Sequence, residues 1–176
     1  LQALAQRGAF LPVIFITGTC ANPLLLGLAQ PGAADGVYSG TFLKDPLDPQ
    51  WQDDDAMREY RDGMTEHADV GDDAINDVIR AYGWTMGALL VHTLEEAEEL
   101  TRPAVMAAAL SLDRVTAGLT LPESPFDTGP GDKYPSEVGR GIRYDEEAGH
   151  FDFVGPLSDY EDRTVEVTPD ELLIEG

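Results

Sequence analysis

The sequence predicts an α/β fold of the doubly wound kind. Pro12–Thr17 is a short, continuously apolar run, typical of a strand that is covered on both faces of a parallel sheet. A loop of small residues follows, and Asn22-Pro23 then supplies the N-cap and the first position of a helix. The order helix, strand, loop, helix is the pattern of open α/β sheets. With 43% hydrophobic residues, the chain is rich enough in apolar side chains to form a core.

Three further elements are predicted in the first part of the chain. Leu1–Arg7 is expected to end a helix, with Gly8 just past its last turn, and Gly36–Leu43 is expected to be a second strand. Asp53-Asp54-Asp55 opens a helix, because carboxylates stabilise the positive end of the helix dipole. Its inward side chains are Met57, Tyr60 and Met64.

A longer helix follows, and its apolar residues recur at helical spacing. Asp72 or Asp73 is expected to cap it, and Thr101 to cap the next helix. Tyr82 and Trp84 can line a cleft, although core packing is favoured for both. The inward side chains of the two helices are expected to be Ile75, Val78, Ile79, Tyr82, Met86, Leu89, Leu90 and Leu94, and then Val105, Met106, Ala109 and Leu110.

Short strands and turns are predicted after Asp113. Val115–Leu121 is expected to be a strand, and Glu137–Tyr144 is expected to form a β-hairpin with His150–Val154. The acidic tail contains one more expected strand, Thr164–Thr168.

The charge disfavours several classes of function. The chain has 33 acidic and 11 basic residues and a net charge of −22. Such a surface repels phosphate groups, so we expect no nucleic-acid partner and no binding to anionic membranes. Pro and Gly residues interrupt the uncharged first stretch, so no direct membrane insertion is expected in this segment.

Motifs for catalysis and for cofactors are not found. No glycine-rich nucleotide loop and no G-x-S-x-G elbow occurs. The three histidines are scattered singly, and one cysteine allows neither an internal disulfide nor an all-cysteine zinc site. We therefore expect no catalytic residue, no metal site and no cofactor.

The loop between the first strand and its following helix is the candidate site. Small ligands bind beyond the carboxyl ends of strands in open α/β sheets, and the helix that starts at Pro23 favours an anion there. Hydroxyl and amide groups of the loop can bind a carboxylate or an amide. The alternative is a plain turn capped by Asn22. The candidate ligand-binding residues are Thr17, Gly18, Thr19, Cys20 and Tyr38.

Several segments together resemble a known family. They are Leu11-Pro-Val-Ile-Phe-Ile-Thr-Gly-Thr, Ala34-Asp-Gly-Val-Tyr-Ser-Gly-Thr-Phe-Leu, Ala81-Tyr-Gly-Trp-Thr-Met-Gly-Ala-Leu-Leu, Leu100-Thr-Arg-Pro-Ala-Val-Met and Asp127-Thr-Gly-Pro-Gly-Asp-Lys-Tyr-Pro. In this order they resemble the type I periplasmic solute-binding proteins of the branched-chain amino acid (hydrophobic amino acid/amide) ABC-transporter family. The likeness covers residues 1–155 and only the C-terminal half of that family.

The resemblance implies a type I periplasmic-binding-protein fold, with two doubly wound lobes of which only the later segments are present. Residues 1–36 would be a segment of the C-terminal lobe. Residues 37–119 would be a crossover and the helical segment of the N-terminal lobe, and residues 120–155 would return to the C-terminal lobe. Residues 156–176 are an acidic tail without a counterpart.

The resemblance also implies a function. The chain would belong to the extracytoplasmic solute-binding component of an ABC importer, which binds an amino acid, amide or carboxylate between the lobes and is not an enzyme. Its partners would be the solute and a membrane permease. It would be periplasmic or on the cell surface, with a signal or lipid anchor expected in a preceding part of the protein.

Two alternatives and one departure from the family remain. The loop Gly18–Ala21 lacks the acid that often meets an amino acid's ammonium in this family, which disfavours an α-amino acid. One alternative is a ligand-sensing receptor or regulator module on the same fold. The other is a hydrolase-like enzyme that uses Cys20 as its nucleophile.

Overall fold

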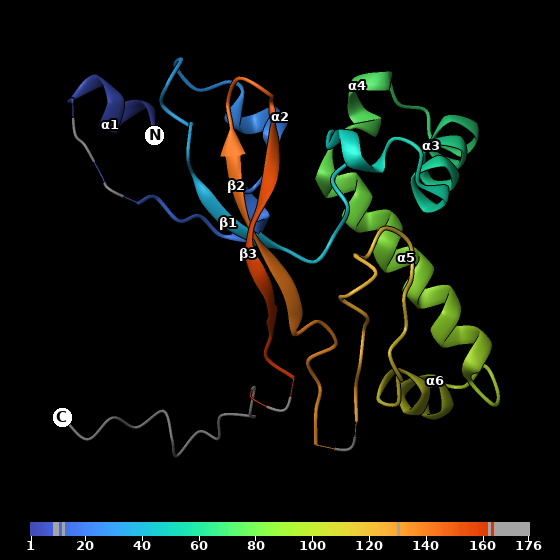
Figure 1. Ribbon diagram of the computed structural model, residues 1–176. Coiled ribbons are helices and arrows are strands. Elements are labelled where there is room, and N and C mark those ends of the chain that lie inside the picture. Colours follow the sequence, from blue (N-terminus) through green and yellow to red (C-terminus); the bar gives the residue numbers. More distant parts are fainter. Residues whose placement is uncertain (9–10, 12, 130, 162, 164–176) are drawn as a thin grey trace, which may run out of the picture.

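The computed structural model describes residues 1–8, 11, 13–129, 131–161 and 163 (Figure 1). A small sheet with α2 beside it forms one part of the molecule, and α3 to α6 form the other (Figure 1). No helix among these residues is both long enough and apolar enough to cross a membrane. The helices are α1 (Gln2–Gln6), α2 (Pro23–Leu26), α3 (Asp55–His67), α4 (Asp72–Ile75), α5 (Val78–Glu96) and α6 (Arg102–Ala109), with single 3₁₀ turns η1 (Gly18–Cys20) and η2 (Pro49–Trp51).

The sheet has three antiparallel strands in the order β1 (Tyr38–Thr41), β2 (Val138–Asp145) and β3 (His150–Asp159). The predicted hairpin is confirmed, since β2 and β3 pair along their length. The expected second strand is also confirmed, as β1. β3 continues beyond its expected end and crosses the expected boundary between residues 155 and 156. The division into lobe segments stays a prediction.

The apolar run at residues 13–16 lies parallel to β1 but is not covered as expected. Ile16 N donates to Tyr38 O at 2.9 Å, and Tyr38 N donates to Ile14 O at 2.8 Å. Val13 is 63% exposed and Phe15 is 71% exposed, so the prediction that both faces are covered is wrong for the described chain. The reason is that the run pairs with β1 alone among the described residues, while alternate side chains point to opposite faces.

Two apolar clusters form the core, one under the sheet and one among the helices. In the cluster among the helices, the Tyr60 hydroxyl donates to the Ile75 carbonyl at 2.7 Å. The predicted inward face of α3 is confirmed, because Met57 and Tyr60 are buried and Met64 packs against them. The cluster under the sheet contains Ala21, Leu26, Ala34, Val37, Ile142, Tyr144 and Phe151, and the cluster among the helices contains Met57, Tyr60, Ile75, Ala81 and Leu119.

The predicted long helix is broken in two. α4 ends at Ile75, and Asp77 has an extended backbone (φ −80°, ψ 116°) before α5 begins. The Asp77 carboxylate accepts from Ile79 N at 2.9 Å, so Asp77 caps α5. The expectation that Asp72 or Asp73 caps this helix is therefore wrong. Asn and Asp side chains compete with the backbone for hydrogen bonds, which favours a break at positions 76 and 77.

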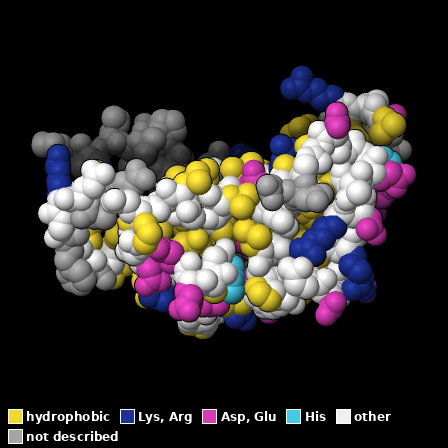
Figure 2. Space-filling model, turned by 90° about the horizontal axis from the view of Figure 1, so that it is seen from above, with side chains coloured by type: hydrophobic (Ala, Val, Ile, Leu, Met, Phe, Trp, Pro, Cys, Tyr) yellow, Lys and Arg dark blue, Asp and Glu magenta, His cyan; other side chains and the backbone are white. Residues whose placement is uncertain are grey.

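The face of α5 that was expected to be inward is largely exposed. Ile79 and Tyr82 are 50% and 47% exposed, whereas Thr85 on the other face is buried. On α6, Met106 and Leu110 are also exposed, against expectation. Hydrophobic side chains reach the surface over the middle of the face shown in Figure 2. Periodicity identified the amphipathic stripe, but much of the stripe remains exposed in the described chain.

Two further strand predictions have different outcomes. Val115–Leu121 is not a strand: this stretch makes isolated bridges, Val115 with Phe126 and Thr120 with Leu43. Two of its backbone amides donate to side chains instead. Leu119 N donates to the Thr85 hydroxyl of α5, and Ala117 N donates to the Thr120 hydroxyl. Thr164–Thr168 lies outside the described residues.

Replacing Gly118 by alanine is expected to destabilise the fold. Gly118 has φ +54°, and a Cβ there would lie 2.7 Å from Thr85 Cα, which is helix backbone. The free energy of unfolding should fall by about 1–3 kcal/mol in urea denaturation. Gly87→Ala on α5 is the control, because nothing lies within 4 Å of its Cβ position and alanine favours a helix. Equal losses from both variants would contradict the packing argument.

Candidate functional site

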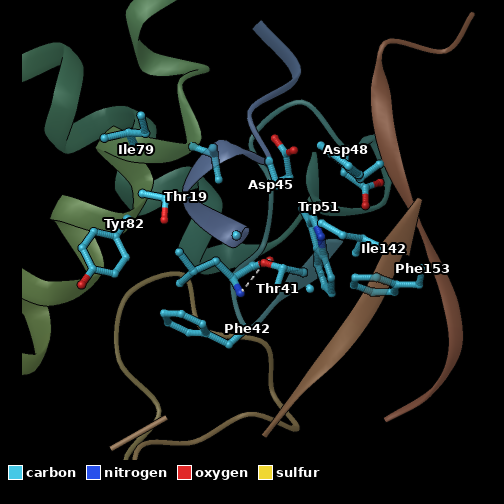
Figure 3. A pocket seen from close by; sticks show the side chains of 16 residues that line it. Thr19, Thr41, Phe42, Asp45, Asp48, Trp51, Ile79, Tyr82, Ile142 and Phe153 are labelled. Carbon is cyan, nitrogen blue, oxygen red and sulfur yellow. Dashed lines mark hydrogen bonds between the residues drawn. The ribbon is translucent and has the colours of Figure 1, made fainter. Parts of the chain in front are cut away.

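A pocket of about 440 Å³ lies between α5, η1 and the strand ends. Figure 3 shows Ile79 and Tyr82 on one side of it and Trp51 and Phe153 on the other, with Thr19 between them. Most of the lining is apolar, and the polar side chains are few. A pocket of this size and composition fits a small organic molecule.

The loop at η1 brings Thr19 to the pocket. Thr17 caps η1, because its hydroxyl accepts from Thr19 N at 3.2 Å, and the two hydroxyls lie 2.9 Å apart. Gly18 packs closely on the sheet, since a Cβ there would lie 3.2 Å from Gly40 O. The short side chains of this loop therefore let it lie directly against β1. As predicted, Asn22 caps α2 by accepting from Leu24 N at 2.9 Å.

The five sequence-predicted site residues divide into two groups. Gly18 and Thr19 line the pocket, whereas Thr17, Cys20 and Tyr38 do not. Cys20 is exposed and Tyr38 is half-buried in β1. A ligand contact by any of the five stays a prediction.

Tyr82 and Trp84 have different surroundings. Tyr82 lines the pocket and stacks edge-on against Phe42, with ring centroids 6.4 Å apart, so its assignment to the core is wrong. Trp84 packs against Tyr60 in the helical core, as expected, with ring centroids 5.7 Å apart.

Two carboxylates in the pocket lining were not singled out from the sequence. Asp45 and Asp48 follow β1 in the turn-rich segment Asp45-Pro-Leu-Asp-Pro49. Burial first, and the nearby Asp48 to a lesser extent, raise the pKa of Asp45, which is about 6 in the folded protein. A hydrogen bond from Leu47 N and the nearby His150 act in the opposite direction. Repeated Asp-Pro steps signal turns, so the sequence offered no reason to assign these acids to a site.

The Trp51 side chain lines the same pocket. Its indole nitrogen is buried and has no hydrogen-bond partner among the described residues. The ring is held by Phe153, whose centroid is 6.4 Å away, and by the Lys44 ammonium 5.3 Å from the ring centroid. A buried donor without a partner costs free energy, so the indole nitrogen lowers the stability of the folded chain.

The pocket joins the two parts of the molecule. Asn22 Nδ2 donates to Asp77 Oδ1 at 2.9 Å, which ties the start of α2 to the cap of α5. The pocket wall from α5 and the wall from η1 are therefore connected at their base. The arrangement offers apolar walls, the hydroxyls of Thr19 and Thr41, and the carboxylates of Asp45 and Asp48. Together they suit a small molecule with both apolar and charged parts.

No protein-family model matches the sequence, and a search of curated proteins also gives no match. Two solved structures have the same fold. A branched chain amino acid ABC transporter structure from Thermus thermophilus with bound valine matches with a TM-score of 0.69 and 14% identity, over 92% of this chain and 44% of that chain. The leucine-binding protein LivK from Thermotoga maritima matches with a TM-score of 0.61 and 13% identity, over 92% and 41%.

These matches show the fold. The chain has the later segments of a type I periplasmic-binding-protein fold, as the sequence resemblance implied. It spans less than half the length of the solved chains that it matches.

Proposed function

We propose that this chain is part of an extracytoplasmic solute-binding protein that holds a small polar organic molecule and delivers it to an ABC permease. The observation that supports this most is the pocket beside Thr19, formed where the two parts of a transporter-type fold meet. The protein would act by cleft closure, in which solute contacts favour the closed state over the open one. It would carry out no chemical step.

The side chains of the pocket favour a solute with an ammonium group. Asp45 can face that group, whereas both carboxylate oxygens of Asp48 accept from Gln50. The Thr19 hydroxyl can pair with a carboxylate or carbonyl oxygen of the solute. Phe42 and Tyr82 leave room for an apolar part. An α-amino acid has all three features. The missing acid in loop Gly18–Ala21 then carries less weight, because acids of residues 45–48 lie in the same pocket.

Replacing Thr19 by alanine is expected to weaken solute binding by about 1–3 kcal/mol, roughly 5- to 150-fold in Kd. The reason is that a polar group of the solute would lose its hydroxyl partner. Isothermal titration calorimetry of the complete protein with valine and with leucine measures this directly. Native mass spectrometry of the protein as purified can identify another retained molecule for the same titration.

Thr65→Ala is the matched control. Thr65 is exposed on α3 and does not line the pocket, so the same change of side chain should leave the affinity unaltered. If Thr19→Ala binds as tightly as Thr65→Ala does, the assignment of Thr19 is wrong. If no small molecule binds or is retained, the proposed function itself fails.

A further inference from the structure

Three carboxylates converge beside the open end of the β-hairpin. The side-chain oxygens of Asp132, Glu137 and Glu161 all lie within 4.8 Å of one another. Glu137 immediately precedes β2, and Glu161 follows β3 by two residues. Antiparallel pairing of the two strands places Val138 opposite Asp159 and so brings the flanking acids together.

Backbone hydrogen bonds hold this group of acids in place. Asp132 and Gly129 exchange two backbone bonds, at 3.0 and 3.1 Å, and the Asp132 carboxylate accepts from Tyr134 N at 2.8 Å. Tyr160 N donates to the Glu137 carbonyl at 3.1 Å. The three carboxylates therefore come from a turn and two strand ends whose positions are set by the backbone.

Glu137 is the member of the group that needs a partner. Both of its carboxylate oxygens are buried, and neither has a hydrogen-bond partner among the described residues. Burying a carboxylate without a partner costs several kcal/mol. Its oxygens lie among other acids, and this combination calls for a bound positive charge.

The wider surroundings of the group are also acidic. Besides the three carboxylates of the group, Asp127 and Asp159 lie near enough to Glu161 for their charges to act on it. Lys133 is next to Asp132 in the sequence and is exposed, with an interaction of its own. Mutual repulsion of these carboxylates destabilises the empty arrangement, and a divalent cation would relieve it.

We propose that Asp132, Glu137 and Glu161 form a calcium site that joins the end of β3 to the loop before β2. Calcium binds six to eight oxygen atoms in flexible geometry, and three carboxylates can supply up to six of them. Magnesium suits the group less, because it requires near-ideal octahedral geometry. The ligands come from two segments far apart in the sequence, so no local spacing motif marks the site.

Calcium is expected to stabilise the complete protein. After treatment with a chelator, the protein is titrated with CaCl₂ against NaCl of the same ionic strength, while thermal unfolding is followed. Tm should rise and saturate at calcium concentrations of about 1 mM or below. Tb³⁺ bound at the site should show luminescence sensitised by Tyr134 or Tyr160, which flank the cluster in sequence.

Two variants distinguish calcium binding at this site from a general screening of surface charge by the added salt. Glu137→Gln should be at least as stable as the wild type without calcium, because it removes a buried like charge, and it should lose the calcium-dependent rise in Tm. Glu147→Gln removes the same charge from an exposed position in the hairpin turn and should keep the rise. Glu161→Gln is the second variant if Glu137→Gln does not fold.

The proposal is overturned if Tm does not respond to about 10 mM calcium beyond the NaCl control. It is equally overturned if Glu137→Gln, or Glu161→Gln in its place, responds as the wild type does. None of the three carboxylates lines the pocket beside Thr19. Loss of calcium binding and failure of solute binding are therefore separate results.

Discussion

Replacing Asp45 by asparagine is expected to raise the free energy of unfolding at pH 7 by up to about 3 kcal/mol. Asp45 is one of the two pocket carboxylates, and its pKa rises from 3.8 to about 6, chiefly through burial. A rise of this size corresponds to about 3 kcal/mol between the two protonation states. Asparagine removes the buried charge, and its amide oxygen can still accept from Leu47 N, which lies 2.9 Å from Asp45 Oδ1.

The pH dependence of the free energy of unfolding tests whether Asp45 is the group responsible. The folded state holds the Asp45 proton more tightly than the unfolded state does, so this group's contribution to stability falls as pH rises from about 4 to about 6. Urea denaturation at several pH values in this range should show that fall in the wild type and a flatter profile in Asp45→Asn. Identical profiles would mean that Asp45 is not the buried, titrating group.

Asp45→Asn also tests how the solute binds. If Asp45 faces the ammonium group of an amino acid, Asp45→Asn should weaken binding while it stabilises the protein. The two effects have a common cause, since a desolvated carboxylate costs stability in the free protein and becomes useful when a cation pairs with it. Calorimetry of the variant with valine or leucine measures the change in affinity.

Replacing Lys44 by methionine is expected to lower the free energy of unfolding by about 3–5 kcal/mol. The Lys44 ammonium is 2.8 Å from both carboxylate oxygens of Asp54, and Lys44 is only 6% exposed. Asp54 in turn caps α3 by accepting from Met57 N at 3.0 Å. Methionine fills similar space but leaves the Asp54 carboxylate partly buried without its cation.

At acid pH, the difference in the free energy of unfolding between Lys44→Met and the wild type should become smaller. Burial alone would raise the pKa of Asp54, but the hydrogen bond and charge of Lys44 and the backbone bond from Met57 lower it overall. The pair's stabilisation is therefore present above the ordinary pKa of aspartate and is lost as pH falls through the lowered value. Urea denaturation at pH 7 and at about pH 3 compares the two conditions.

Arg58→Met is the control for this experiment. Arg58 pairs with Asp55 on the surface of the same helix, where both side chains are exposed, and such pairs contribute at most about 1 kcal/mol. Adding Asp54→Asn to Lys44→Met should recover part of the loss, because it removes the unpaired charge. Equal losses from Lys44→Met and Arg58→Met would show that the buried pair adds no more than a surface pair.

Lys44 also connects stability with the pocket. Its ammonium lies over the Trp51 ring, so Lys44→Met removes a contact that orients the indole. Tryptophan fluorescence of the folded variant should therefore change, although Lys44 itself does not line the pocket.

Local sequence was sufficient for the features that depend on near neighbours. Asn22 caps α2 as expected, and the helix expected to open at Asp53-Asp54-Asp55 is capped by Asp54. Such features are local, because an N-cap bond reaches only two or three residues along the chain. The hairpin of β2 and β3 follows from two strand-forming runs joined by a short turn. The break at Asp77 was missed because the apolar period of the helix continues across it.

The sequence by itself determined the α/β class, the hairpin and the starts of α2, α3 and α6, because periodicity and capping are local. The tertiary structure alone decided which face of α5 is buried, how Asp45, Asp48 and Trp51 come to line one pocket with Thr19 and Tyr82, and how Asp132 and Glu137 approach Glu161. These arrangements join residues that are far apart in the chain. Burial and charge act through space, so no spacing along the sequence records them.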